Sequence, residues 1–117
     1  MRALIVLLAG LAFVSNAIAA PKFVSSEEFS VAVVDKTIGS KTKKGVPFTA
    51  IVKKGGTGVF TAKGKDPQTF TWDFKGDTFC WHFPSFTECN KVEIVSKKAA
   101  NFYDSASGKL NNAYVVK

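Results

Sequence analysis

Apolar and polar residues alternate strictly along residues 70–83, on both sides of the pair Gly76-Asp77. This alternation around a Gly-Asp pair is typical of a β-hairpin whose two-residue turn begins with glycine. The hairpin is predicted to place three aromatic pairs on one face: Phe74 with Phe79, Trp72 with Trp81, and Phe70 with Phe83. Burial of one large apolar side chain contributes about 1.5–3 kcal/mol, so we expect this face, with both tryptophans, to form the core.

The other face of the same two strands is mostly polar and carries Thr71, Asp73, Cys80 and His82. A second turn at Pro84-Ser85 would return the chain and place Cys80 opposite Cys89. In the first hairpin the backbone N–H and C=O of Cys80 point toward Asp73. Cys80 and Cys89 are therefore a non-hydrogen-bonded pair, in which side chains approach most closely. The sequence therefore predicts a cross-strand disulfide between Cys80 and Cys89.

Glycines divide the rest of the chain into short predicted strands. Residues 47–54 and 57–63 flank Gly55-Gly56, which is a second signal for a two-residue turn. Such a turn predicts two cross-strand pairs, namely Val52 with Val59 and Ala50 with Thr61. After the cysteines, Val92 and Ile94 continue the aromatic side of the sheet, and residues 101–104 and 113–116 form a last hairpin.

A capping box at Ser25 and Glu28 predicts a helix start before the apolar residues 29–34. That segment is rich in valine and would also make an acceptable strand. With short connections throughout, the chain is predicted to be mainly β: seven or eight antiparallel strands in a meander that forms a small barrel or half-barrel, with one short N-terminal helix.

The first residues have the pattern of a secretory signal peptide. Arg2 precedes an apolar run over residues 3–14, and the small residues Ala17 and Ala19 follow as a cleavage site. We expect residues 1–19 to be removed and 20–117 to form a single exported domain, periplasmic or secreted, with no transmembrane segment. The alternative is an N-terminal anchor helix, but the apolar run is shorter than the ~20 residues that span a bilayer.

The exported part is basic. Its 15 lysines outnumber 9 acidic residues, for a net charge of +6, because the only arginine, Arg2, lies in the predicted signal peptide. Residues 36–65 hold eight lysines and no acidic residue: Lys36, Lys41, Lys43, Lys44, Lys53, Lys54, Lys63 and Lys65. Such a field attracts an anionic polymer, an anionic membrane surface or another envelope protein. Without arginine, sequence-specific nucleic-acid binding is not expected. Alternatively, the lysines only protect strand edges from pairing with other chains.

His82 is the only histidine, and it shares the outer face with Asp73 and Thr87. A His/Asp/Thr group is the base and nucleophile of some hydrolases, and Cys80, His82 and Cys89 are three potential zinc ligands. The first lacks a glycine-rich nucleophile turn and the second lacks a fourth ligand. No phosphate loop or dinucleotide fingerprint is present either, so we predict no catalytic residue, metal or cofactor.

Taken together, these features favour an exported β-rich binding or interaction protein without catalytic activity, which engages an anionic partner or an envelope component. Two alternatives belong to other classes. A small hydrolase-type enzyme would need His82, whereas a structural envelope protein would need neither His82 nor the lysines.

A set of residues spread over nearly the whole exported chain resembles a family of small exported bacterial proteins: Lys36-Thr37-Ile38, Gly45, Phe48, Gly56-Thr57, Trp72, Gly76-Asp77, Cys80, Cys89, Tyr103-Asp104 and Gly108-Lys109. That family shares a signal peptide, a short helix and a Trp-x-x-x-Gly-x-x-x-Cys hairpin with a second cysteine downstream. Here Asp35 stands where the family more often has glycine. The resemblance implies the β-rich fold and export, and it transfers no mechanism.

Overall fold

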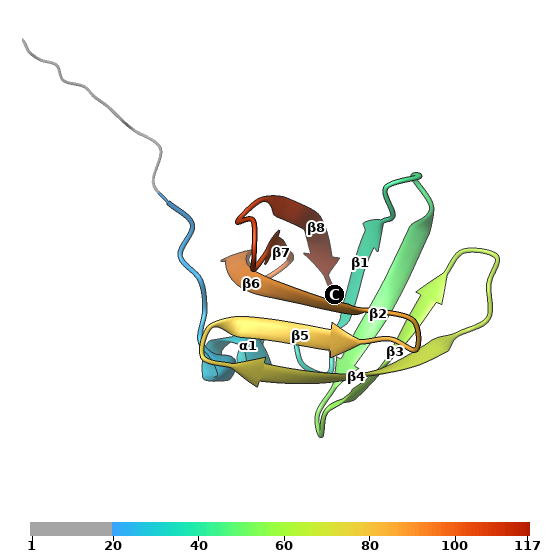
Figure 1. Ribbon diagram of the computed structural model, residues 1–117, viewed down its shortest axis with the longest axis horizontal. Helices are drawn as coiled ribbons and strands as arrows, with labels where there is room; N and C mark the ends of the chain where they lie inside the picture. The colour runs from blue at the N-terminus through green and yellow to red at the C-terminus, as the bar shows by residue number, and fades with distance from the viewer. Residues whose placement is uncertain (1–19) are drawn as a thin grey trace, which may run out of the picture.

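The computed structural model describes residues 20–117, and the predicted signal peptide lies outside the described residues. The described residues form one helix and a closed barrel of eight antiparallel strands, each paired with the next and the last with the first (Figure 1). The elements are α1 (Ser26–Ala32), β1 (Thr37–Lys41), β2 (Pro47–Lys53), β3 (Thr57–Ala62), β4 (Gln68–Lys75), β5 (Thr78–His82), β6 (Thr87–Ser96), β7 (Ala99–Asp104) and β8 (Leu110–Val116). The predicted fold class is confirmed, and the sheet closes into a full barrel.

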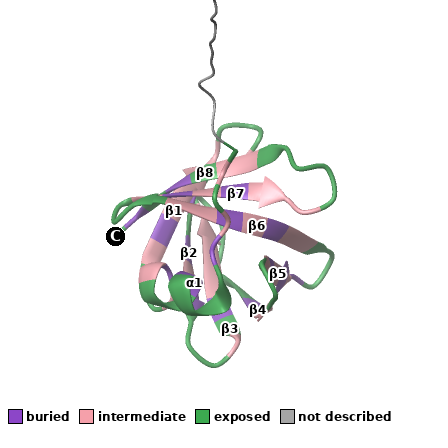
Figure 2. Cartoon of the chain, turned by 90° about the vertical axis from the view of Figure 1, so that its left-hand side faces the viewer, coloured by how far each residue is buried: buried purple, intermediate pink, exposed green. Residues whose placement is uncertain are grey.

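The two ends of the barrel differ. Because successive strands are antiparallel, the loops after β1, β3, β5 and β7 share one end, which we call the open end; it comprises residues 42–46, 63–67, 83–86 and 105–109. The closed end comprises the other three turns and α1 (Figure 1). Figure 2 looks at this closed end, where the outer surface of α1 is exposed.

Helix α1 begins with the predicted capping box. The Ser25 hydroxyl accepts a hydrogen bond from the Glu28 backbone N–H, and the Glu28 carboxylate accepts one from the Ser25 N–H at 3.0 Å. The helix buries Phe29 completely, with its ring centroid 4.8 Å from that of Phe79 and 5.1 Å from that of Phe74. Aromatic packing therefore fills this end of the barrel. Within residues 20–117 no helix is long and apolar enough to cross a bilayer.

The central hairpin has the predicted register. Trp72 pairs with Trp81 and Phe74 with Phe79, and Gly76 has a φ of 64°, as its turn position requires. Trp81 is buried, with 3% of its surface exposed. Trp72 is only partly buried but packs against the core, so the predicted burial of both tryptophans holds fully for Trp81 alone. Its indole N–H lies at the closed end, within hydrogen-bond distance of two backbone carbonyls, those of Lys53 and Thr57.

The predicted register of β2 and β3 is wrong by one residue. Val52 pairs with Gly58, and Ala50 with Phe60, because the loop contains three residues, Lys54 and both glycines, instead of two. A shift of one residue exchanges the two faces of a strand. The actual register turns Phe60 toward the interior, where its ring stacks on Phe48 at 4.7 Å. The core gains an aromatic ring that the predicted pairing would have turned outward.

Asp35 precedes β1 with a φ of 65°, in the left-handed region that glycine favours. Aspartate tolerates this conformation better than most residues, and the carboxylate of Asp35 accepts a hydrogen bond from the Lys54 N–H at 3.0 Å. Asp35 therefore makes the connection into β1 without a glycine.

Candidate functional site

A cavity of about 290 Å³ occupies the open end of the barrel. Its aromatic lining consists of Phe48, Phe60, Trp81, Phe83, Phe86 and Tyr114. Its polar lining consists of Thr42, Lys43, Gln68, Glu88, Asn111 and Asn112. The interior is thus packed with rings toward the closed end and hollow toward the open end. The mixed aromatic and polar lining of the cavity is typical of a small-ligand site.

Three of the polar lining residues, Glu88, Asn111 and Asn112, come from β6 and β8. Glu88, Asn90 and Val92 alternate along β6, so the strand changes from polar to apolar as it runs away from the open end. In β8 the pairing register shifts between Phe102 and Tyr103, which pair with Asn112 and Leu110 and leave Asn111 between them. An extra residue of this kind is a β-bulge, which can redirect a side chain, here that of Asn111.

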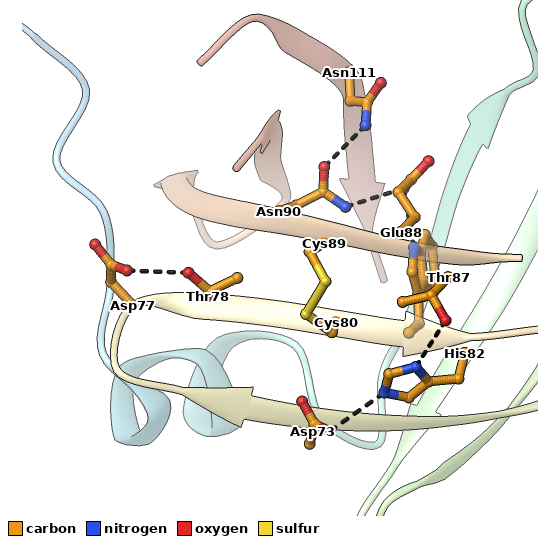
Figure 3. Close-up of a disulfide and its surroundings, with 11 residues drawn as sticks. Asp73, Asp77, Thr78, Cys80, His82, Thr87, Glu88, Cys89, Asn90 and Asn111 are labelled. Carbon is orange, nitrogen blue, oxygen red and sulfur yellow. Dashed lines mark hydrogen bonds and ion pairs between the residues drawn. A yellow bond between two sulfur atoms is a disulfide. The ribbon is translucent and has the colours of Figure 1, made fainter. Parts of the chain in front are cut away.

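These residues form a chain of hydrogen bonds inside the barrel (Figure 3). The indole N–H of Trp81 donates to Glu88 Oε1 at 2.9 Å, and the Asn90 amide donates to the same oxygen at 3.0 Å. The Asn111 amide then donates to Asn90 Oδ1 at 3.0 Å. Asn90 is fully buried, and both the nitrogen and the oxygen of its side-chain amide have a hydrogen-bond partner. The network holds Glu88 and Asn111 in fixed positions at the cavity wall.

Tyr114 completes the cavity wall as a neutral phenol. Its pKa is raised far above the ordinary value of 10.0, first by burial and second by the negative charge of Glu88. The ring lies 4.4 Å from that of Phe102, centroid to centroid. Tyr114 therefore offers an uncharged aromatic wall at any physiological pH.

The eight lysines of residues 36–65 do not form one surface. Five lie on the loops or strand end around the cavity, namely Lys41, Lys43, Lys44, Lys63 and Lys65, and three lie at the closed end, namely Lys36, Lys53 and Lys54. All eight are exposed. Lys109, on the loop between β7 and β8, adds a sixth lysine at the open end.

The seam where the barrel closes adjoins the cavity. Strands β1 and β8 are paired at only two positions, Ile38 with Val116 and Gly39 with Val115. Toward the open end, Ser40 Oγ bridges the strands instead, with contacts to Asn112 Oδ1 at 3.1 Å and to the Ala113 carbonyl at 2.9 Å. A surface groove runs over this seam, and both it and the cavity are lined by Phe48 and Asn112.

His82 lies on the outer wall, in contact with both residues that the sequence placed beside it (Figure 3). Its Nε2 is 3.3 Å from Asp73 Oδ2, and its Nδ1 is 3.0 Å from Thr87 Oγ1. A neutral imidazole that donates to Asp73 can accept the Thr87 proton, which is the hydrogen-bond order of a base and nucleophile. The side chains of His82 and Asp73 are 39% and 46% exposed, however, so water reaches the cluster. Its evident effect is to link three adjacent strands, β4, β5 and β6.

The predicted disulfide between Cys80 and Cys89 is confirmed, with Cα atoms 4.1 Å apart (Figure 3). Both sulfur atoms are thereby occupied, so the zinc interpretation loses two of its three ligands. Sequence reasoning did not identify the cavity residues Gln68, Glu88, Asn111 and Asn112. For Glu88 a signal existed, since it alternates with the outward-facing Cys89 and must therefore point inward.

Comparisons with protein-family models, with curated proteins and with solved structures found no significant match to this chain.

Proposed function

We propose that this protein is an exported binding protein that engages an anionic partner at the open end of its barrel. The observation that carries this proposal is that five lysines, Lys41, Lys43, Lys44, Lys63 and Lys65, lie at the open end, where Lys43 lines the cavity. A ring of positive charge around a concave site raises the local concentration of anions and guides them inward.

The local balance of charge supports this orientation. Lys109 adds to the five lysines, whereas the acidic residues on the same loops and strand ends are Asp66, Asp104 and, at the cavity wall, Glu88. The Asp104 carboxylate accepts a hydrogen bond from the Ser107 N–H at 2.7 Å, which lowers the pKa of that carboxyl group and keeps it ionised. The excess of lysines remains, so the open end attracts anions through their charge.

The proposal is tested with two triple variants that remove the same charge from opposite ends of the barrel. One combines Lys41→Gln, Lys43→Gln and Lys44→Gln, and the control combines Lys53→Gln, Lys54→Gln and Lys97→Gln. All six lysines are exposed, so both variants should fold. Elution from heparin in a salt gradient is measured for each, because charge attraction weakens as the Debye length falls from about 10 Å at 0.1 M salt to about 3 Å at 1 M.

We expect the open-end variant to elute at clearly lower salt than the closed-end control. Elution of the two variants at the same salt concentration would mean that only net charge matters, and the proposed docking end would be wrong.

A further inference from the structure

We propose that the cavity at the open end binds one sugar unit of an anionic glycan, while the surrounding lysines hold its sulfate, phosphate or carboxylate groups. The inference depends on the proposed function for the charge of the ligand. Recognition of the sugar unit is inferred separately, from the residues of the cavity wall.

The cavity wall presents hydrogen-bonding groups that the protein does not use up. The internal network occupies Glu88 Oε1 and the Asn111 amide nitrogen, which leaves Glu88 Oε2 and Asn111 Oδ1 as acceptors. Asn112 is bonded to Ser40 through Oδ1 and to the Tyr114 hydroxyl, which leaves one N–H of the Asn112 amide as a donor. Gln68 is exposed and adds a donor and an acceptor. Neighbouring hydroxyls of a sugar require this mixture of acceptors and donors.

Aromatic rings cover the rest of the wall, which suits the C–H faces of a sugar ring. At the rim, Phe86 remains 54% exposed although its ring stacks on that of Phe83, with the centroids 4.9 Å apart and the planes 18° from parallel. Because the Phe86 ring is exposed and also lines the cavity, it would contact a sugar bound there.

The groove over the β1–β8 seam gives a polymer a way out of the cavity. It shares Phe48 and Asn112 with the cavity, and Lys41 and Lys117 are among its lining residues. A glycan with one unit in the cavity can therefore continue along the seam beside two positive charges.

Other occupants fit the same wall less well. An acyl chain from a membrane lipid would take water away from Glu88, Asn111 and Asn112 without replacing its hydrogen bonds, which is costly. An ammonium ligand would suit Glu88 and the rings, but the lysines at the mouth would repel it. An anionic glycan satisfies both the wall and the rim.

The two tryptophans allow a direct test, because each indole N–H lies at a different end of the barrel. That of Trp81 is bonded to Glu88 at the cavity wall, and that of Trp72 is at the closed end. The exported protein is titrated with a sulfated heparin disaccharide, its desulfated counterpart, and phosphatidylglycerol vesicles, while both indole resonances are followed by NMR. We expect the sulfated disaccharide to shift the Trp81 resonance and leave that of Trp72 in place.

Variants at exposed positions sharpen this test without disturbing the fold. Phe86→Ala and Gln68→Ala should each weaken binding of the sulfated disaccharide about three- to tenfold, as expected for one lost aromatic contact or hydrogen bond. Val31→Ala is the matched control, since Val31 is 78% exposed on α1 at the closed end. It should leave the Kd unchanged.

The outcomes separate this inference from the proposed function. If the desulfated disaccharide still shifts the Trp81 resonance while the lysine variants elute alike from heparin, the sugar site is correct and the anionic docking end is wrong. If vesicles bind and neither disaccharide shifts Trp81, the partner is a membrane surface and the sugar site is wrong. Equal affinity in Phe86→Ala, Gln68→Ala and the control would also overturn the sugar site.

Discussion

The closed and open ends of the barrel are built from the same eight strands, yet their interiors differ. At the closed end, Phe29 from α1 packs on Phe74 and Phe79 and is completely buried. At the open end, the inward positions include Glu88 and Asn90, and a cavity remains. Filling an interior with rings stabilises a fold, whereas polar groups at a hollow end give up part of that stability and leave hydrogen-bonding groups for a ligand.

The largest effect should come from the ring that fills the closed end. Phe29→Ala should lower the free energy of unfolding by about 3–5 kcal/mol, because it leaves a cavity in a packed aromatic cluster. Phe86→Ala at the open end should change it by only about 0.5 kcal/mol or less, since that ring is half-exposed. Urea unfolding measures both. Comparable losses in the two variants would abolish the contrast between the ends.

The disulfide lies between the two ends and should have the next largest effect. Replacing both Cys80 and Cys89 with serine should cost about 2–3 kcal/mol, because the bridge closes a short loop in the unfolded chain. The bridged residues neighbour Trp81 and Glu88, so we also expect weaker ligand binding at the open end. Alkylation of the protein isolated from its own host without reductant, followed by mass measurement, should add nothing; two labelled thiols would show that the bridge does not form in the host.

Two strand glycines test how tightly the closed half is packed. A Cβ at Gly58 would collide with the ring of Phe70 and lie 2.6 Å from the Ile51 carbonyl oxygen, so Gly58→Ala should destabilise the fold by about 1–3 kcal/mol. Gly39 in β1 is the matched control, because a Cβ there would meet its nearest atom, the Phe48 carbonyl oxygen, at an ordinary 3.6 Å. Thermal unfolding of both alanine variants is the measurement. Equal melting temperatures would show that β3 and β4 separate easily.

The smallest expected effect concerns the start of α1. Hydrogen bonds from the backbone and side chain of Ser25 lower the pKa of Glu28 below its ordinary 4.5. A lowered pKa in the folded state means stability that is present above pH 4.5 and is lost as the pH falls through the lower folded value. Glu28→Gln should therefore lower the melting temperature slightly at pH 7, and the difference from the wild type should disappear at low pH, which flattens the acid side of a plot of melting temperature against pH. An unchanged acid slope would mean that the capping box does not hold α1 over the barrel.

The sequence by itself determined the features that depend on neighbours along the chain. The alternation on both sides of Gly76-Asp77 sets the aromatic pairs, and the following turn then places Cys80 opposite Cys89, because each hairpin fixes the register of the next strand. The capping box of Ser25 and Glu28 was readable for the same reason, since its hydrogen bonds span only three residues. Where the local signal was ambiguous, as in the loop with Gly55-Gly56, the register was predicted incorrectly by one residue.

Only the tertiary structure decided which residues meet across the barrel. The eight lysines within residues 36–65 are divided between opposite ends of the barrel, because successive antiparallel strands carry alternate loops to opposite ends. Glu88 and Asn111 converge on one cavity although 22 residues separate them in the chain, and their meeting needs both the closed barrel and the irregular register of β8. Pairing between neighbouring strands is a local interaction, whereas closure and the cavity depend on the summed twist and packing of all eight strands.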